Sequence, residues 1–532
     1  MKRRSFLAAA GAGLAAQNLA LPSVVRAQGA STLRFIAEID LTFLDPHFTP
    51  ANVTRSHGFM VFDTLFGEDG KGGTSHQMLE GHTVEDAGKL WTLTLRDGLL
   101  FHDGERVLAR DCVASIRRWA RRDPIGEAMM AATDELSAPT DKTIVFRLKK
   151  PFPLLPYALG KVASPICAIM PARLAETDAF KQVTEMVGSG PFRFLANERV
   201  QGARNVYAKF DKYVPRKDGT VTWSAGPKVV NFDRVVWTTI PGNATKANAM
   251  LAGEHDWWAN PGYDLLPLLR RNPRIALQVL NEMGGVTMVR SNMLQPPFNN
   301  VAIRRALLKA IDQRAFMEAI VGDETDFIRN PYGVFPNGSP MVSKVGMEVL
   351  AGPRDVAKVR EEIKAAGYAG EKIVLIVPTD YQDLKATADV WADLLKRCGM
   401  DVDYVATDWG QMLTRRNNKG PVTQGGWSCF TTGWSGSSVD TPAGHPPLRG
   451  NGDSQAAWPG WYVSPKMEAL RTEWFDAPDV AAQKAICDRI QALFFEEVPY
   501  WPVGQAVGPT AYRKDLTGVV DGHTVFWNVR RA

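Results

Sequence analysis

Long apolar runs are missing from the sequence after its N-terminal segment. No later stretch approaches the ~20 consecutive apolar residues that a membrane-spanning helix needs. A block of basic residues interleaved with aromatic ones, typical of nucleic-acid-binding proteins, is also missing. What is left is an ordinary globular composition, 45% hydrophobic and 22% charged, without internal repeats or low-complexity tracts. A membrane-spanning protein is therefore excluded, and no nucleic-acid partner is expected.

Common catalytic motifs are missing as well. The sequence has no H-E-x-x-H zinc motif and no P-loop. It has no G-x-S-x-G turn, because Gly433-Trp434-Ser435-Gly436 lacks the second glycine in register. The eight histidines are dispersed, and His76 and His82 form the closest pair. We therefore expect no enzyme activity, no metal site and no cofactor.

Cysteine is rare, with five residues and no C-x-x-C pair. An odd number leaves at least one free thiol in an oxidising compartment, and the spacing fixes no pairing. We expect none or one disulfide. The first cysteine is Cys112, so no cysteine is available near the N-terminus for lipid attachment.

The N-terminus has the features of an export signal. Lys2-Arg3-Arg4-Ser5-Phe6-Leu7 leads into a weakly apolar run, residues 7–16, which is too short to cross a bilayer. This pattern is typical of a twin-arginine signal, the alternative being a flexible basic tail. Val25-Arg26-Ala27 predicts cleavage near Ala27 and a soluble periplasmic protein. Without residues 1–27, 58 basic residues stand against 57 acidic ones, a net charge of +1.

The length and the local patterns predict two lobes of different character. About 500 residues exceed what one hydrophobic core usually serves. Alternating segments at residues 90–95 and 143–148 predict strands of a half-buried sheet. Strands at residues 372–377 and 400–405, separated by a helix at 384–397, predict a parallel strand-helix-strand crossover.

Several short motifs follow one another along the chain. They are Leu44-Asp45-Pro46-His47, Phe62-Asp63-Thr64-Leu65-Phe66, the segment 95–105 with 109–113, Gly188-Ser189-Gly190-Pro191-Phe192, the segment 296–301 with 304–307 and 310–312, and Glu497-Val498-Pro499-Tyr500-Trp501-Pro502. In this order they resemble the extracellular solute-binding proteins, family 5, of dipeptide, oligopeptide and nickel ABC importers. Each motif also has a structural reason. Gly104 tolerates a left-handed turn, for example, and Asp111 lies in the first turn of a helix, where a carboxylate favours the dipole.

The resemblance implies an α/β, bilobal periplasmic-binding-protein-like fold (type II, cluster C). Mixed sheets flanked by helices form two lobes that close around a ligand, and the first lobe has an extra subdomain. Hinges are expected near Gly284-Gly285 and near residues 499–502. The expected division is a signal peptide at residues 1–27, the first lobe at 28–66 and 188–284, its extra subdomain at 67–187, the second lobe at 285–501, and a return to the first lobe at 502–532.

Ligand contacts are expected on both lobes. The Gly- and Ser-rich segment 425–440 holds Trp427, Phe430 and Trp434, which suit an aromatic wall. For Trp427 and Phe430 the alternative is the core of the lobe. An amide such as that of Asn52 both donates and accepts hydrogen bonds. On the first lobe the resemblance places contacts at Thr49, Pro50, Ala51 and Asn52.

Two positions depart from the peptide-binding members. Those members carry an acidic residue three positions after the loop tryptophan, where this chain has Ser437, with Asp440 as the nearest acid. Dipeptide binders also offer an arginine at the place where this chain has Asp380 and Tyr381. Since a buried charge without its partner is costly, a free dipeptide is disfavoured as the ligand. Tyr381 and Asp380 are second-lobe candidates, and Asp380 or Asp440 could engage a cationic ligand.

The resemblance implies the periplasmic substrate-binding component of an ABC importer. Such a protein captures a small polar solute, a peptide or a peptide-like molecule, and delivers it to the transmembrane subunits of a permease. The alternatives are a receptor of the same fold for an opine, an oligosaccharide or a metal chelate, or an envelope chaperone or signalling co-receptor. A monomer exported by the twin-arginine machinery is expected.

Overall fold

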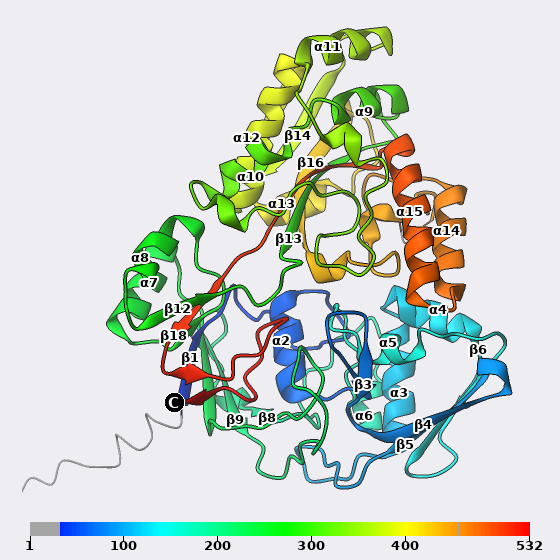
Figure 1. The fold of residues 1–532 in the computed structure, drawn as a ribbon, viewed down its shortest axis with the longest axis vertical. Helices are drawn as coiled ribbons and strands as arrows, with labels where there is room; N and C mark the ends of the chain where they lie inside the picture. Colours follow the sequence, from blue (N-terminus) through cyan, green and yellow to red (C-terminus); the bar gives the residue numbers. More distant parts are fainter. Residues whose placement is uncertain (1–31, 455–456) are drawn as a thin grey trace, which may run out of the picture.

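The structure, a computed structural model, describes residues 32–454 and 457–532 (Figure 1). The predicted signal peptide and its cleavage site near Ala27 lie outside the described residues. Three larger sheets, of seven, five and four strands, organise the chain. They belong to the first lobe, the second lobe and the extra subdomain, respectively.

The seven-stranded sheet of the first lobe is built around β1 (Thr32–Ile36), which pairs in parallel with β10 (Arg234–Thr238) and β11 (Trp257–Trp258). Phe35 of β1 lies at the centre of an aromatic core, and its ring centroid is 5.0 Å from that of Phe526 near the C-terminus. The order of the sheet is β12-β18-β11-β1-β10-β9-β8. The remaining strands are β8 (Phe192–Phe194), β9 (Arg204–Lys209), β12 (Ile275–Gln278) and β18 (Thr510–Arg513).

The five-stranded sheet of the second lobe has the order β15-β14-β16-β13-β17. Strands β14 (Lys372–Pro378) and β15 (Asp401–Thr407) are parallel and joined by helix α12 (Gln382–Arg397). The predicted strand-helix-strand crossover is therefore confirmed. β14 is buried almost throughout, as expected for an apolar strand covered on both faces. The other strands are β13 (Gly285–Ser291), β16 (Cys429–Ser435) and β17 (Tyr500–Ala506).

The extra subdomain contains an antiparallel sheet with the order β4-β5-β7-β6. The two predicted strands are present as β5 (Leu90–Leu95) and β7 (Thr143–Leu148), and every second side chain of β5 is buried. Helix α3 (Ala109–Ala120) packs against this sheet. Its N-terminus is fixed by Asp111, whose carboxylate accepts a hydrogen bond from the Leu108 amide at 2.9 Å. The outer strands are β4 (Leu79–Glu85) and β6 (Thr133–Ser137).

The smaller elements fill the spaces between these sheets. In Figure 1, helices α14 and α15 of the second lobe lie beside α4 of the extra subdomain. Lys150 and Asp476 form an ion pair of 2.6 Å across this contact. The short strands are β2 (Phe66–Glu68), β3 (Thr74–His76), β19 (Leu516–Thr517) and β20 (Arg530–Arg531). The remaining helices are α2 (Asn52–Val61), α4 (Pro124–Ala132), α5 (Leu155–Gly160), α6 (Ala172–Ala175), α7 (Asn243–Ala252), α8 (Leu266–Arg270), α9 (Val301–Leu308), α10 (Gln313–Val321), α11 (Val356–Ala365), α13 (Trp409–Arg415), α14 (Pro465–Asp476) and α15 (Val480–Glu497).

The two chain crossings between the lobes lie next to each other. The first crossing leads into β13 at Gly285 and agrees with the expected position near Gly284-Gly285. The second crossing is later than predicted. Residues 500–506 form β17, which pairs with β13 in the second-lobe sheet, so the chain leaves that lobe after Ala506 and not at residues 499–502. The return segment predicted at 502–532 therefore begins its first-lobe pairing with β18 at Thr510.

Candidate ligand-binding site

A cavity of about 1130 Å³ lies between the two lobes. Its walls come from the end of β1, the start of α2 and the loop after β11 in the first lobe. Opposite them lie the end of α10, the start of α12 and the end of β16 in the second lobe. Both chain crossings border it too. This volume lies just above the range of roughly 300–1,000 Å³ that small-molecule pockets have.

Both walls are built where parallel strands end. Glu38 follows β1 and Asn260 follows β11 in the first lobe. Tyr381 and Asp383 follow β14, and Trp409 follows β15, in the second lobe. Parallel strands bring their carboxyl ends to one edge of a sheet, and that edge is where open α/β sheets bind ligands. The topology therefore explains why segments distant in sequence meet at this cavity.

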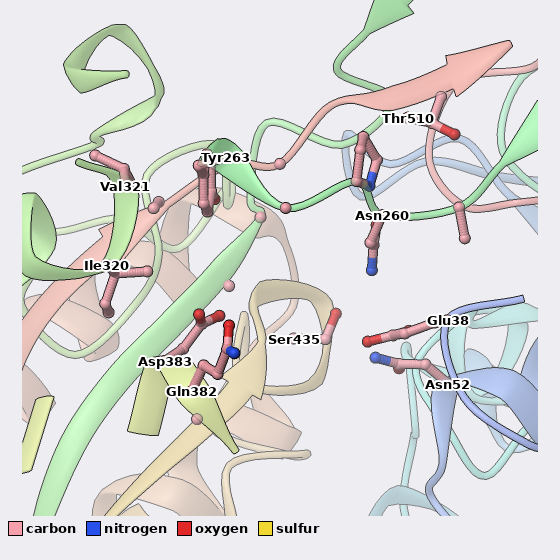
Figure 2. Close-up of a pocket in the computed structure, with 18 of the residues that line it drawn as sticks. Glu38, Asn52, Asn260, Tyr263, Ile320, Val321, Gln382, Asp383, Ser435 and Thr510 are labelled. Atoms are coloured by element: carbon pink, nitrogen blue, oxygen red, sulfur yellow. The ribbon is translucent and has the colours of Figure 1, made fainter. Parts of the chain in front are cut away.

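Glu38 is a carboxylate of the first-lobe wall. Figure 2 shows Glu38 and Asn52 side by side, both directed from the first lobe toward Ser435 of the second lobe. Burial raises the pKa of Glu38, and the charge of Asp383 raises it further. Arg55 and a hydrogen bond from Asn260 act in the opposite direction. A carboxylate in this setting gains from any cation that enters the cavity.

The second-lobe wall combines a carboxylate with aromatic rings. Burial raises the pKa of Asp383. Burial, together with the nearby charges of Glu38 and Asp383, raises the pKa of Tyr381 to about 12. The Tyr381 ring is 45% exposed and lies 5.7 Å from that of Trp409, measured between centroids. This corner therefore offers negative charge and aromatic faces together.

Another part of the wall carries hydrogen-bond donors. Arg55 is 8% exposed, and burial lowers its pKa to about 10. His523 is 5% exposed, and burial holds the pKa of its ring well below the usual value, so the imidazole is neutral. Trp434 is half-buried, and its ring lies 5.9 Å from that of Trp458. Arg55, His523 and Trp434 all line the cavity, and each has an N–H group that can donate a hydrogen bond to a ligand.

The structure brings three of the residues predicted from the sequence to the cavity wall, namely Asn52, Tyr381 and Trp434. Trp427 and Phe430 lie in a hydrophobic cluster with Met412 and Trp461, in agreement with the alternative of a core position. Their side chains are fully buried, and neither lines the cavity; Phe430 packs against Trp458, which separates it from the Trp434 ring on the wall. Their contact with a ligand is thus not supported.

The other predicted residues lie behind the wall or outside it. Asp380 accepts a hydrogen bond from the Trp409 amide at 2.9 Å, so it supports α13 and not the cavity surface. Ser437 and Asp440 are buried, with 2% and 6% of their surface exposed. The side chain of Thr49 accepts a hydrogen bond from the Ala51 amide. Among the described residues, the cavity lining does not include Thr49, Pro50, Ala51, Asp380, Trp427, Phe430, Ser437 or Asp440.

Several wall residues were not predicted from the sequence, above all Glu38, Asn260, Tyr263 and Asp383. A signal for Glu38 and Asp383 was present, since each follows a strand that pairs in parallel with its neighbours. Acidic residues at such positions are also common in turns, however, so pattern alone does not separate the two roles.

The described residues also bear on three other features: a metal site, a disulfide and a membrane-spanning helix. Within residues 32–454 and 457–532, no group of three or more His, Cys, Asp or Glu side chains is arranged to hold a metal ion. All five cysteines are free and buried, within the predicted range of none or one disulfide. Among the described helices, none is long and apolar enough to cross a membrane.

Comparison with known proteins agrees with this geometry. The family model of the bacterial extracellular solute-binding proteins, family 5 (middle region), matches residues 74–456. The chain belongs to this family. It is 36% identical to the probable peptide ABC transporter periplasmic-binding protein y4tO of Sinorhizobium fredii, over 100% of this chain and 99% of that one. It is 25% identical to the glutathione-binding protein GsiB of Pectobacterium atrosepticum, over 90% of this chain and 89% of that one.

Solved structures share the fold at low sequence identity. The dipeptide-binding protein of Pseudoalteromonas sp. SM9913, solved with Met-Leu, has a TM-score of 0.77 at 17% identity and covers 94% of this chain and 100% of its own. AgaA of A. tumefaciens R10, solved with agropinic acid, has a TM-score of 0.74 at 21% identity, with 94% and 99% covered. The predicted family and the predicted bilobal α/β fold are confirmed. The protein is a periplasmic solute-binding protein.

Proposed function

We propose that this protein is the substrate-binding component of an ABC importer and that it releases its ligand unchanged. It captures a small polar solute, a peptide or a peptide-like molecule, and delivers it to the transmembrane subunits of a permease. The cavity of about 1130 Å³ carries this proposal, because its two walls belong to different lobes. A ligand that contacts both walls favours the closed arrangement, which gives a permease a shape to recognise.

The names of similar proteins support the ligand class. The y4tO protein is a probable peptide transporter component, and GsiB is named for glutathione. AgaA was solved with agropinic acid, so an opine is the alternative, with oligosaccharides and metal chelates as further ones. Asn52, Tyr381 and Trp434 are the predicted residues that we retain as ligand contacts, because all three line the cavity.

The route to the periplasm is a second part of the proposal. The Arg3-Arg4 pair and the short apolar run after it support export by the twin-arginine machinery, with cleavage near Ala27. The mature protein acts as a monomer. Mass spectrometry of the periplasmic protein tests the cleavage site, and substitution of both arginines by lysine should keep the protein in the cytoplasm.

A thermal-shift screen tests the binding function. The library contains peptides, opines, amino-acid derivatives, oligosaccharides and metal chelates. A ligand at 100 times its Kd should raise the free energy of unfolding by about 2.7 kcal/mol through mass action. Mass spectrometry of the protein purified from its host identifies a ligand that stays bound. A library without any stabilising compound, together with an empty purified protein, would contradict the proposal.

A further inference from the structure

Two carboxylates lie on opposite walls of the cavity. Glu38 comes from the first lobe and Asp383 from the second, and both are directed into the space between the lobes (Figure 2). They are close enough for the charge of Asp383 to act on Glu38. Like charges that face each other repel, and the charges of Arg55 and Lys246 offset part of this repulsion at Glu38, so a cation between the two carboxylates favours the approach of the walls.

The cavity as a whole has a surplus of negative charge. Glu324 is paired with Arg270 at 2.7 Å. The other acidic side chains of the wall form no ion pair with any described residue. Arg55 is the one arginine or lysine among the described residues of the lining. The acidic residues without an ion pair are Glu38, Asp264, Asp323 and Asp383.

Aromatic rings surround the two facing carboxylates. Tyr263 and Tyr381 lie close enough to Asp383 for its charge to raise the pKa of both phenols. Trp409 continues this wall beside Tyr381. The face of an aromatic ring attracts a cation, most strongly where the cation has lost its water. This part of the wall is therefore complementary to an organic cation: the carboxylates match its charged group, and the aromatic rings match its apolar carbon atoms.

A separate observation concerns buried polar atoms of the cavity wall that lack a hydrogen-bond partner. Neither ring nitrogen of His523 has a hydrogen-bond partner among the described residues, although the side chain is only 5% exposed. The Nε of Arg55, which is 8% exposed, and the Nε1 of Trp434 also lack a hydrogen-bond partner among the described residues. Buried polar groups in proteins are almost always hydrogen-bonded, so these groups mark where polar atoms of a bound solute would lie.

We infer that the ligand carries an ammonium or guanidinium group that binds between Glu38 and Asp383. The substrate class is thus an organic cation, such as a basic peptide or a guanidino compound, with further polar atoms toward Arg55 and His523. The inference rests on the proposed function and narrows it. A cation can contact Glu38 and Asp383 at the same time only when the lobes are closed. The positive charge of the ligand therefore stabilises the closed form.

Matched ligands that differ only in charge test this inference by isothermal titration calorimetry. The probes are Nα-acetylarginine with Nα-acetylcitrulline, and the Nα-acetylated tripeptides Ala-Arg-Ala, Ala-citrulline-Ala and Ala-Glu-Ala, so that the arginine guanidinium is the one cationic group in each set. The cationic member of each set should bind at least about 10-fold more tightly, as expected for hydrogen bonds to a charged group. Glu38→Gln and Asp383→Asn should each weaken its binding by about 10-fold and reduce the preference for it. Asp393→Asn is the control, because Asp393 lies on the same helix, α12, in an exposed pair with Arg397.

The outcomes separate this inference from the proposed function. A ligand without any ammonium or guanidinium group that binds well, or that is found in the purified protein, overturns the inference and leaves solute binding intact. Unchanged affinity of both charge-neutral variants for a cationic probe also overturns it. Thermal unfolding without ligand shows that the variants are folded. If no solute of any charge binds, both the inference and the proposed function are wrong.

Discussion

Arg55 of the first lobe donates a hydrogen bond from Nη1 to the Oγ of Ser437 in the second lobe, over 3.3 Å. The Oγ of Ser435 lies 3.0 Å from the same hydroxyl. Ser437 stands where the resemblance led us to expect an acidic residue in a peptide binder, yet it is buried and outside the cavity lining. It therefore connects the lobes, and the negative charge of the site comes from Glu38 and Asp383 instead.

Ser437→Ala should weaken ligand binding modestly. The variant loses one hydrogen bond between the lobes, worth about 1 kcal/mol, and leaves the cavity surface as it is. We expect the Kd of the ligand to rise by about 5-fold, measured by calorimetry. Ser438→Ala, the neighbouring substitution, serves as the control and should bind as the wild type does. Identical Kd values for the two variants would show that the Arg55 contact does not support closure.

Two tryptophans of the same segment should respond in opposite ways to alanine substitution. Trp427 is fully buried in a core cluster, so Trp427→Ala should lower the free energy of unfolding by about 3–5 kcal/mol. Trp434 is half-buried on the cavity wall, so Trp434→Ala should mainly raise the Kd of the ligand. Chemical denaturation and calorimetry on both variants measure the two effects. Equal losses of stability would assign Trp434 to the core.

Gly284 should be intolerant of a side chain. Its φ is 49°, and a Cβ at this position would lie 2.3 Å from the carbonyl oxygen of Ala506 on the other crossing. Gly284→Ala should therefore destabilise the protein by about 1–3 kcal/mol and disturb the way the crossings pass each other. Gly285→Ala is the matched control, because the nearest atoms to its Cβ would be 3.9 Å away. Thermal unfolding of both variants measures the difference in stability. Equal melting temperatures would show that the backbone at Gly284 can accept a side chain.

Stability should depend on pH through Glu68, a buried residue of β2. Burial raises the pKa of Glu68 to about 7, although the Val162 amide donates a hydrogen bond of 2.7 Å to its carboxylate. A folded-state pKa above the unfolded value of 4.5 means that its contribution is fully present below about pH 4.5 and is lost as the pH rises through 7. Glu68→Gln should therefore be more stable relative to the wild type at pH 8 than at pH 5.

Denaturation of both proteins at the two pH values measures this difference, which should reach roughly 2.5 kcal/mol. Asp440 of the second lobe adds to the effect, because burial and the charge of Glu68 raise its pKa as well. Glu80→Gln, on the exposed edge of β4, is the control and should show no such change. The same stability difference at both pH values would mean that Glu68 is ionised throughout.

The fold could be predicted because its signals are local and ordered. The strand at residues 90–95 and the crossover from β14 to β15 each follow from the pattern of a short segment. The ordered motifs predict the bilobal fold as a whole. The second chain crossing could not be placed, because Pro499 and Pro502 look like the end of an element. In the structure the pairing with β13 continues past them to Ala506, with an irregularity between Thr287 and Met288.

The site was harder to predict than the fold. Glu38 and Asp383 are far apart in sequence, and the parallel pairing of β1 with β10 and of β14 with β15, in two different sheets, places the ends of both strands at the cavity. Conversely, Gly and Ser around Trp427 and Phe430 suggested an exposed loop, whereas these rings pack inside the lobe. Composition near a residue describes the backbone it can adopt. It does not say toward which side of a sheet the side chain is directed.

The position of β18 has a consequence for how the protein is made. This strand comes from the C-terminal end of the chain, yet it lies inside the first-lobe sheet between β11 and β12, and Phe526 packs on Phe35 of the first strand. A chain without residues 510–532 lacks both partners. A chain that ends at residue 509 should therefore be cut in the first lobe by low doses of protease that spare the complete protein. Strands far apart in the sequence thus complete one sheet, and the first-lobe sheet stays incomplete until residues 510–513 have joined it.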